Sequence, residues 1–492
     1  MSYFTPNAEL LAQSTKALAS INKARLQTSS ATLNVYDPAT EEVIASLPDH
    51  NAVNAIEAVA KADAAGKAWA KTSPRHRSDV LHAVYATLIE NKETLALVIS
   101  REMGKPLSEG YAEVQYSADY VRWFAEEALR AKGSYRDSPA GDATILVRSS
   151  PVGLAILIAP WNFPMAMATR KIAPALAAGC GAVVKPANLT PLTTVLVLDL
   201  MIQAGVPEDL VQVITTTNAS AFSEAVMADE RVRKISFTGS TPVGSTLMGL
   251  AARNIVKSSM ELGGNAPLLV FDDADLERAI DGAILAKMRN GGQTCVAANR
   301  MFVQDGIADA FIEGFTERMA TFKLGNALNP EVDLGPVIDR RAVNRLSALV
   351  NDAVAKGASL RTGGSALDRP GFFFEATVLD NVPANADIAT TEIFGPVAAI
   401  TRFATQEEAI RSANDTQFGL AAFVFTENLD RAINVAEALE TGMVGINNGL
   451  LSNVAAPFGG VKQSGTGREG GAEGLEEYQE LRYFTMKRRE TF

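Results

Sequence analysis

The sequence predicts an α/β protein with a doubly wound parallel sheet followed by a second α/β unit, and two observations support this. From about residue 151 onward, short apolar runs alternate with helical segments of about 10–15 residues. This alternation is typical of parallel βαβ units joined by right-handed crossovers. In addition, 492 residues are too many for one hydrophobic core, so two or three domains are expected.

The part of the chain before residue 131 is expected to begin with helices. In segments 52–70 and 77–101, apolar residues recur three and four positions apart, which predicts two amphipathic helices. The polar segment 136–141 contains Pro and Gly. The alternating segment 143–153 that follows it fits a short hairpin or connector.

The parallel-sheet pattern then runs to residue 253, and a second α/β series follows it. The predicted strands are 154–160, 181–186, 210–216, 232–240, 266–274 and 299–306. The predicted helices are 165–179, 190–205, 220–229, 241–253, 275–288 and 307–322. The second series begins near Ser259 and continues past residue 440. The alternating tail 481–489 predicts an exposed edge strand, which favours pairing with another subunit.

Composition excludes several classes of protein. The net charge of -11 argues against nucleic-acid and anionic-membrane partners, because both need a basic surface. With only Cys180 and Cys295, no disulfide framework is expected, and a reducing compartment is the simpler interpretation. No signal peptide and no apolar run of about 18 residues is recognised, so the cytoplasm is predicted. The histidines (His50, His76 and His82) lie within the first hundred residues, so no metal site or Ser-His-Asp triad is expected downstream.

Three segments carry candidate reactive groups. Cys295 ends the segment GGQTC, where two glycines let a ligand approach the thiol closely. A buried structural role is the alternative for a lone cysteine, and it is favoured for Cys180 between small apolar residues. Glu261 in MELGGNAP fits either a general base or an exposed loop charge. Asn162 in PWNFP fits either a fixed amide donor or a rigid turn.

Seven segments in matching order and spacing resemble the aldehyde dehydrogenase superfamily over most of the chain. They are PWNFP at 160–164, KPA at 185–187, FTGS at 237–240, ELGG at 261–264, GGQTC at 291–295, EIFGP at 392–396 and PFGGVKQSG at 457–465. The resemblance implies an aldehyde-dehydrogenase-like fold with a nucleotide-binding domain, a catalytic domain and a small β oligomerisation arm. The implied boundaries are 1–130 with 150–260, then 261–460, and 131–149 with 470–492 for the arm.

The resemblance also implies a mechanism that general chemistry supports. Cys295, as a thiolate, attacks the aldehyde carbon and gives a thiohemiacetal oxyanion. The Asn162 amide and the Cys295 backbone N–H stabilise that oxyanion. Hydride leaves to a nicotinamide, and Glu261 activates the water that hydrolyses the resulting thioester.

The implied cofactor is NADP or NAD. Gly239, Ser240 and Gly244 lie at a strand-to-helix turn whose N–H groups and helix dipole can receive a pyrophosphate, although the GxGxxG fingerprint is absent. The other implied contacts are Trp161, Lys185, Glu392 and Phe394. Many NAD-preferring relatives have Glu where this chain has Asn188, and losing that carboxylate removes a like-charge penalty against a 2′-phosphate. NADP is therefore slightly favoured.

Two arginines near the thiol suggest an aldehyde substrate with a distal carboxylate. Arg170 lies eight residues after Asn162, and Arg289 lies six residues before Cys295, so both can face the substrate. A structural ion pair is the alternative for each arginine taken alone. Together with Ser452, they resemble the carboxylate-binding set of the succinate-semialdehyde dehydrogenase branch. The expected tunnel walls are Phe163 and Phe458.

Other functions remain open at this point. Within the enzyme class, the alternative is a broad-specificity aliphatic or aromatic aldehyde dehydrogenase, with the arginines serving structure. A catalytically silent binding or structural protein is disfavoured by the presence of Cys295, Glu261 and Asn162, and Glu261 also disfavours acyl transfer to coenzyme A. Because Ala297 stands where several relatives have a second Cys, no redox-switch disulfide is expected. Succinate and glutarate semialdehyde are not distinguished, and a homodimer or homotetramer is expected.

Overall fold

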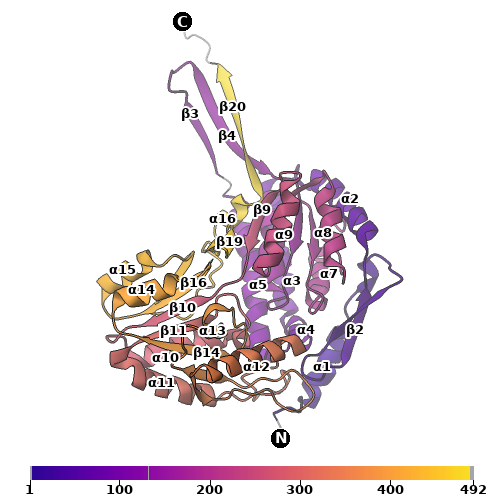
Figure 1. Cartoon of the computed structure of the whole chain (residues 1–492). Helices are drawn as coiled ribbons and strands as arrows, with labels where there is room; N and C mark the ends of the chain where they lie inside the picture. Colours follow the sequence, from indigo (N-terminus) through magenta and orange to yellow (C-terminus); the bar gives the residue numbers. More distant parts are fainter. Residues whose placement is uncertain (1–2, 131, 488–492) are drawn as a thin grey trace.

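A computed structural model describes residues 3–130 and 132–487 (Figure 1). The chain begins with α1 (Ala8–Ala19), the 3₁₀ turn η1 (Lys23–Arg25) and the hairpin β1 (Thr32–Tyr36) and β2 (Val43–Pro48). Four helices follow: α2 (Ala52–Trp69), α3 (Pro74–Glu90), α4 (Lys92–Met103) and α5 (Leu107–Glu127). In the described residues, no helix is long and apolar enough to span a bilayer.

The prediction of one helix over 77–101 is wrong, because the chain breaks at Asn91 between α3 and α4. Asn91 has φ -98° and ψ 17°, which is outside the helical region. Its side-chain amide donates to the carbonyl of Thr87 at 2.8 Å. This competition between an Asn side chain and the backbone is the usual reason that asparagine ends a helix.

The first large sheet is doubly wound and has six strands in the order β19-β9-β8-β5-β6-β7. Its parallel strands are β5 (Leu154–Ile158), β6 (Ala182–Lys185), β7 (Val211–Val213), β8 (Val232–Thr238) and β9 (Lys257–Glu261), and β19 (Gly465–Thr466) joins antiparallel. The crossover helices are α6 (Ala166–Ala178), α7 (Leu192–Gln203), α8 (Ala219–Ala228) and α9 (Thr241–Ala252). Because strand order reverses between β5 and β8, the carboxyl ends of these two strands flank a topological switch point, where open α/β sheets bind ligands.

The second large sheet has seven strands in the order β12-β13-β14-β11-β10-β16-β17. The parallel strands are β10 (Ala266–Val270), β11 (Ala298–Gln304), β13 (Thr377–Asp380), β14 (Val397–Phe403), β16 (Ala421–Phe425) and β17 (Met443–Ile446), and β12 (Ser359–Thr362) runs antiparallel at the edge. Its helices are α10 (Leu276–Met288), α11 (Asp305–Ala320), α12 (Arg340–Ala355), α13 (Asp387–Thr390), α14 (Gln406–Asn414) and α15 (Leu429–Ala438). The short strands β15 (Phe418–Gly419) and β18 (Val461–Lys462) pair beside it.

A three-stranded antiparallel sheet projects from the body of the molecule (Figure 1). It consists of β3 (Gly133–Asp137), β4 (Ala143–Pro151) and, after the short helix α16 (Glu473–Glu476), β20 (Gln479–Lys487). We call these three strands the arm. The tail predicted as a strand is therefore the edge strand β20, and residues 488–489 of that prediction lie outside the described residues.

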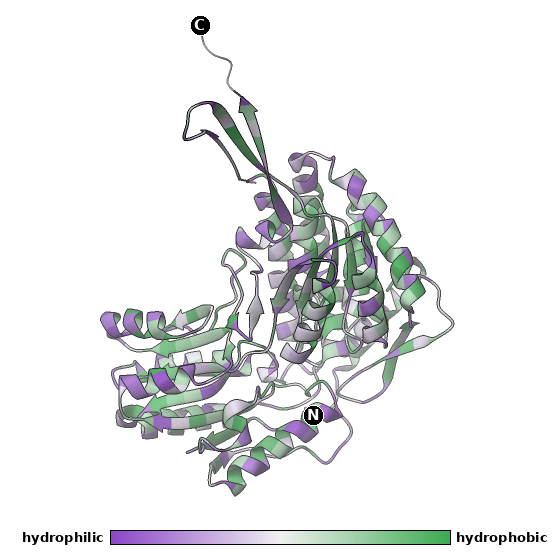
Figure 2. Cartoon of the chain, turned by 45° about the horizontal axis from the view of Figure 1, so that its top comes forward, coloured by the Kyte–Doolittle hydropathy of each residue, from purple (hydrophilic) through white to green (hydrophobic). Residues whose placement is uncertain are grey.

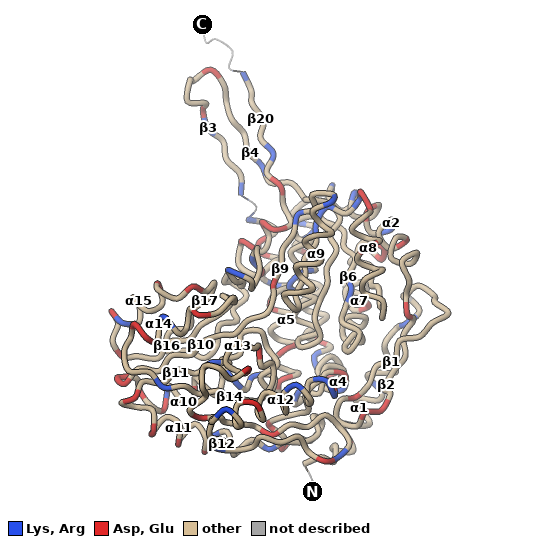
Figure 3. Tube along the Cα trace, in the orientation of Figure 1, with Lys and Arg blue, Asp and Glu red and all other residues tan. Residues whose placement is uncertain are grey.

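The arm leaves apolar side chains exposed at its surface. Tyr135 is 71% exposed, Leu481 77% and Tyr483 64%. Elsewhere, apolar residues concentrate on the strands of the two large sheets, as the hydropathy colouring of Figure 2 shows. Basic and acidic residues are interspersed along the trace rather than gathered in a basic stripe (Figure 3).

Candidate active site

Two loops from different sheets meet at the switch point. One follows β5 and carries Asn162, and the other follows α10 and carries Cys295. The Nδ2 of Asn162 donates to the backbone carbonyl of Gln293 at 3.0 Å, which fixes the amide plane. Within the described residues this is the one hydrogen bond that Nδ2 makes, so its second N–H is free to donate elsewhere.

The glycines before Cys295 are required by a close approach of two backbones. After α10 the chain forms the 3₁₀ turn η2 (Arg289–Gly292) and enters the left-handed region at Asn290 (φ 57°). Gly292 also has positive φ (72°), and a side chain there would collide with the carbonyl of Gly395. On the opposite side, a side chain at Gly264 would collide with the carbonyl of Cys295. The GGQTC and ELGG segments therefore fit against each other and fix the position of the thiol.

One pocket of about 200 Å³ opens at this junction. It brings together twelve of the residues predicted from the sequence. These are Trp161, Asn162, Phe163, Arg170, Gly239, Ser240, Arg289, Cys295, Glu392, Phe394, Ser452 and Phe458. The predicted residues that do not line it are Glu261, Lys185, Asn188 and Gly244.

The thiol of Cys295 is held in its protonated form by its surroundings. Burial raises its pKa to about 12, and the nearby carboxyls of Glu392 and Glu261 add to the increase, while Arg170 opposes it. The backbone N–H of Cys295 donates to no carbonyl of the described chain. The amide of Asn162 and this N–H thus belong to two residues that line the same pocket and can supply two donors, which is what an oxyanion needs.

Glu261 ends β9 and is enclosed beside the pocket rather than in it. Neither of its carboxyl oxygens has a hydrogen-bond partner in the described residues. Burial and the neighbouring charge of Glu469 raise the pKa of this carboxyl well above its usual value. A carboxyl with a raised pKa that lies within electrostatic reach of the thiol is suited to accept and release a proton.

Arg170 has an acidic partner that the sequence did not reveal. Its guanidinium forms a buried ion pair with Glu469, which also binds the ammonium of Lys171. The guanidinium also lies over the ring of Phe458, 4.6 Å from its centroid. Arg170 still lines the pocket, and its Nη2 has no hydrogen-bond partner in the described chain. The ion-pair interpretation and the substrate interpretation therefore both apply to this side chain.

Arg289 differs from Arg170 because no described carboxylate lies within ion-pair distance of it. Its Nη1 donates to Ser452 Oγ at 2.9 Å, so two predicted carboxylate-binding residues meet directly. The guanidinium packs over the rings of Phe163 and Tyr116, with centroids at 5.0 and 5.6 Å. An anionic group entering the pocket would find here an unpaired cation and a hydroxyl.

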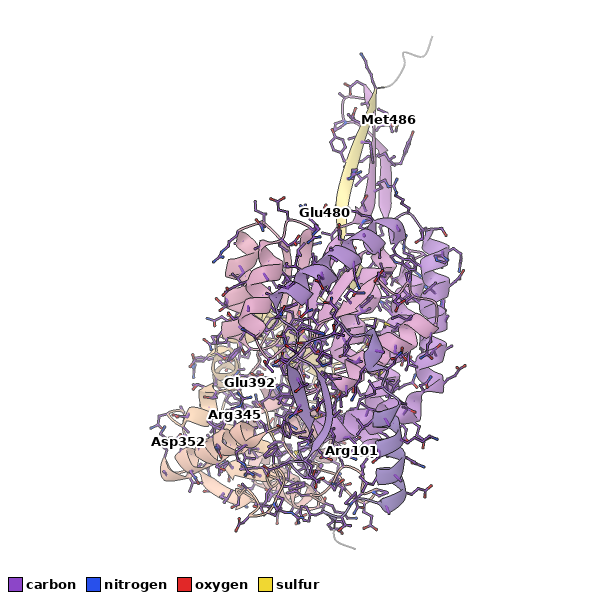
Figure 4. All side chains as sticks on the ribbon, turned by 90° about the vertical axis from the view of Figure 1, so that its right-hand side faces the viewer. Arg101, Arg345, Asp352, Glu392, Glu480 and Met486 are labelled. Carbon is purple, nitrogen blue, oxygen red and sulfur yellow. The ribbon has the colours of Figure 1, made fainter. Side chains whose placement is uncertain are left out.

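The opposite part of the pocket fits one end of a dinucleotide. Trp161 and Phe394 make an edge-to-face contact at 5.3 Å. Glu392 accepts the backbone N–H of Gly264 at 3.0 Å, and burial raises the pKa of its carboxyl to about 7. Figure 4 shows Glu392 next to Arg345 of α12, whose guanidinium donates to the carbonyl of Phe394 at 3.3 Å. Carboxyl and guanidinium groups of this kind suit ribose hydroxyls.

The adjoining surface at the switch point offers a place for phosphates. Helix α9 begins after Ser240, whose side chain makes no capping bond, so the first N–H groups of the helix remain available. Gly244 packs against Leu262 in the first turn of α9 and holds the helix close to the chain after β9. Lys185 Nζ lies 3.4 Å from Asn188 Oδ1 at the end of β6, and burial lowers its pKa to about 8. The residues present therefore fit a nicotinamide dinucleotide.

Several residues of the site were not predicted. They are Tyr116, Arg345, Glu469, Lys171 and the loop residues Asn290 and Gln293. The nearest sequence signal was the polar RNGGQ run before the thiol, which marks a turn but not its partners. Glu469 stands 299 positions after Arg170 in the sequence, and no periodic pattern links the two residues.

Comparison with known proteins agrees with this geometry. The family model described as "Aldehyde dehydrogenase family" matches residues 26–484. The succinate-semialdehyde dehydrogenase of Paenarthrobacter nicotinovorans is 48% identical over 90% of this chain and 98% of its own length. A probable NADP(+) succinate-semialdehyde dehydrogenase of Sinorhizobium fredii is 47% identical over 92% of each. The crystal structure of succinate-semialdehyde dehydrogenase from Burkholderia pseudomallei superposes with a TM-score of 0.92 at 44% identity, covering 94% of this chain and 96% of that chain.

The family match covers almost the whole chain, and the relatives are matched over nearly their full length. Six of the seven segments that resembled one superfamily contribute residues to one pocket in the structure, and KPA at 185–187 lies outside it. This chain belongs to the aldehyde dehydrogenase family.

Proposed function

We propose that this chain is an NAD(P)-dependent dehydrogenase that oxidises succinate semialdehyde, or a similar ω-carboxy aldehyde, to the dicarboxylate. The observation that carries the substrate class is Arg289, which is bonded to Ser452 and unpaired with any described carboxylate, in the same pocket as Cys295. An aldehyde whose far end is a carboxylate would place one end on this pair and the other at the thiol. The names of the relatives from Paenarthrobacter and Sinorhizobium support the same substrate.

The chain's own groups account for the covalent part of the reaction. The thiol of Cys295 releases its proton to solvent and its sulfur bonds to the aldehyde carbon, while the Asn162 amide and the Cys295 N–H hold the oxyanion. NAD(P)⁺, when bound, supplies the hydride acceptor. Glu261 then takes a proton from the water that attacks the thioester, which releases the carboxylate and restores the thiol.

Replacing Arg289 with Met is expected to separate anion recognition from catalysis. A charge-assisted hydrogen bond contributes about 1.5–3 kcal/mol, so kcat/KM for succinate semialdehyde should fall by roughly 10–150-fold. Butyraldehyde has the same four carbons without the carboxylate, and its kcat/KM should change by less than about threefold. Steady-state rates with both aldehydes are the measurement.

Arg170→Met is the comparison variant for this experiment. It leaves Glu469 buried with Lys171 as its remaining cation partner and also removes a guanidinium from the pocket, so activity should fall with both aldehydes, and further with succinate semialdehyde. If Arg289→Met lowers both values of kcat/KM equally, the carboxylate-binding role is wrong. The chain would then be a broad-specificity aldehyde dehydrogenase with structural arginines.

Asn188 is the residue that favours NADP in this proposal. Replacing it with Glu is expected to lower kcat/KM for NADP by about 10–100-fold, because a carboxylate beside Lys185 would repel the 2′-phosphate. The kcat/KM of this variant for NAD should stay within about threefold of the wild-type value. Asn188→Gln keeps the site neutral and should leave the NADP-to-NAD ratio unchanged. Equal losses with both cofactors in the Glu variant would contradict this role of position 188.

The arm supports the proposal of a homo-oligomer. Both β3 and β20 are edge strands, and the exposed Tyr135, Leu481 and Tyr483 give the arm an apolar surface that a second copy would cover. We accordingly assign 131–149 and 470–492 to oligomerisation, 1–130 with 150–260 to cofactor binding and 261–460 to catalysis. A monomer in sedimentation velocity would contradict the first assignment. A cytoplasmic location also stays a prediction.

A further inference from the structure

Beneath the pocket lies an ion pair that the proposed mechanism does not use. Lys105, just before α5, and Glu113, in the second turn of that helix, are joined by an Nζ–Oε2 contact of 2.6 Å. Their side chains are 1% and 0% exposed. Burial lowers the pKa of Lys105, while the charges of Glu113 and Glu109 oppose that change. Separating a buried ion pair leaves an uncompensated charge and costs much free energy, so groups that are hydrogen-bonded to such a pair are held in place.

This pair holds the loop that carries Asn162. Lys105 Nζ donates to the backbone carbonyl of Asn162 at 2.9 Å and lies over the ring of Phe163, 3.9 Å from its centroid. The other oxygen of Glu113 accepts the backbone N–H groups of Met165 (2.9 Å) and Ala166 (3.3 Å). Helix α6 has no side-chain cap from its own N-cap residue, so Glu113 supplies one from a different helix.

One helical turn earlier, a second carboxylate holds the loop that carries Cys295. Glu109 lies four residues before Glu113, so both face the same side of α5. Its Oε1 accepts the backbone N–H of Asn290 at 2.8 Å. Asn290 is the residue with positive φ that opens the turn leading to the thiol. The left-handed conformation at this position costs free energy, and this hydrogen bond helps to maintain it.

The side chain of Asn290 then joins the two loops directly. Its Nδ2 donates to the carbonyl of Asn162 at 2.9 Å and to the carbonyl of Gln293 at 3.0 Å. The Gln293 carbonyl also accepts the Asn162 amide. The oxyanion donor and the nucleophile are therefore linked through three hydrogen bonds, and both ends of that link are attached to α5.

From this network we infer that Glu113, together with Lys105 and Glu109, positions the oxyanion donors relative to the sulfur. None of these three residues lines the pocket, so they act through Asn162 and Cys295 and touch no substrate. The inference rests on the roles proposed above for Asn162 and Cys295. A displacement of about 1 Å in such an arrangement lowers a rate by about 100-fold, whereas the intrinsic reactivity of the sulfur is unaffected.

Two reagents distinguish positioning of the oxyanion donors from reactivity of the thiol, and neither needs a cofactor. With p-nitrophenyl acetate, the sulfur bonds to the carbonyl carbon, the acyl C–O bond breaks, and p-nitrophenolate leaves with the bonding electrons. That reaction passes through an oxyanion. With iodoacetamide, the sulfur displaces iodide from a saturated carbon, and no oxyanion forms. In both reactions the thiol proton goes to solvent.

Glu113→Gln is expected to lower the rate of the p-nitrophenolate burst by roughly 10–100-fold while the alkylation rate of Cys295 stays within about twofold. When the amide oxygen faces the α6 N–H groups, it keeps their acceptor, but the NH₂ group then faces Lys105. In the opposite orientation, Lys105 meets an uncharged oxygen and the α6 N–H groups lose their acceptor. Glu109→Met removes the acceptor of the Asn290 N–H, together with a negative charge near Lys105 and Arg289, and should show the same selective loss. The Glu109 variant therefore still tests the inference if the Glu113 variant does not fold.

Asp37→Asn is the matched control, because it breaks another enclosed ion pair, Arg101–Asp37 at 2.9 Å, that contacts neither loop. It should lower Tm but leave both rates within about twofold. Burst rates of the Glu113 and Glu109 variants equal to wild type would overturn the inference. Equal losses in acylation and alkylation, or an equal loss in the Asp37 variant, would also overturn it. A wild-type chain that released p-nitrophenolate no faster than Cys295→Ala would instead contradict the role of Cys295 itself.

Discussion

Replacing Cys295 with Ala should lower kcat for aldehyde oxidation by at least about 10⁴-fold, since Cys295 is the one thiol among the described residues that line the pocket. The thiol lines the same pocket as the Asn162 amide, and the Cys295 N–H donates to no carbonyl of the described chain, so both groups can bind an oxyanion formed on the substrate. The measurement is cofactor reduction at saturating aldehyde, both in steady state and in the first turnover. The variant should show no rapid first turnover.

Cys180 provides the control for this substitution. It is buried, it donates to the backbone carbonyl of Tyr478, and burial raises the pKa of its thiol to about 11. Cys180→Ala should leave kcat within about twofold and change stability only through packing. A Cys295→Ala variant that retained more than a hundredth of wild-type kcat would mean that the thiol is not the nucleophile.

Replacing Glu261 with Gln should lower steady-state kcat by about 10²–10⁴-fold without removing the first turnover. The thiohemiacetal and the thioester need Cys295 and the oxyanion donors, so one equivalent of cofactor per site should still be reduced rapidly. Hydrolysis then becomes slow, because the water has lost its base. Rapid-mixing absorbance shows this as a full burst followed by a slow phase.

The pH dependence identifies the group that this substitution removes. Burial and Glu469 raise the pKa of the Glu261 carboxyl, so its basic form appears only as pH rises through that raised value. In wild type the rate of thioester hydrolysis, measured after the first turnover, should therefore increase with pH. In Glu261→Gln this increase should be lost. The burst rate should still rise with pH in both, because the pKa of Cys295 is also raised.

Glu477→Gln is a suitable comparison because Glu477 is another carboxylate near the sheet, paired with Lys234 at 2.9 Å, and it does not line the pocket. This variant should keep both phases near their wild-type rates. A Glu261→Gln variant in which the burst disappears along with turnover would contradict a role confined to thioester hydrolysis.

The sequence alone determined the order of strands and helices in the doubly wound sheet. Apolar runs such as 154–160 and 181–186 are buried on both faces, and the helical period between them is local, so each can be recognised from its neighbours. The motif spacing likewise identified Cys295 as the candidate nucleophile. Local patterns failed at Asn91, where a side-chain hydrogen bond to Thr87 ends a helix that the apolar period would continue.

The tertiary structure decided which charges are paired and which are free. From the sequence, Arg170 and Arg289 were equivalent candidates, but Glu469 comes from a distant part of the chain to pair with the first, and no described carboxylate lies within ion-pair distance of the second. No sequence pattern indicated that α5 supports the loops that carry Asn162 and Cys295. Ion pairs and hydrogen bonds depend on distance in space, and residues hundreds of positions apart carry no shared period that would reveal their contact.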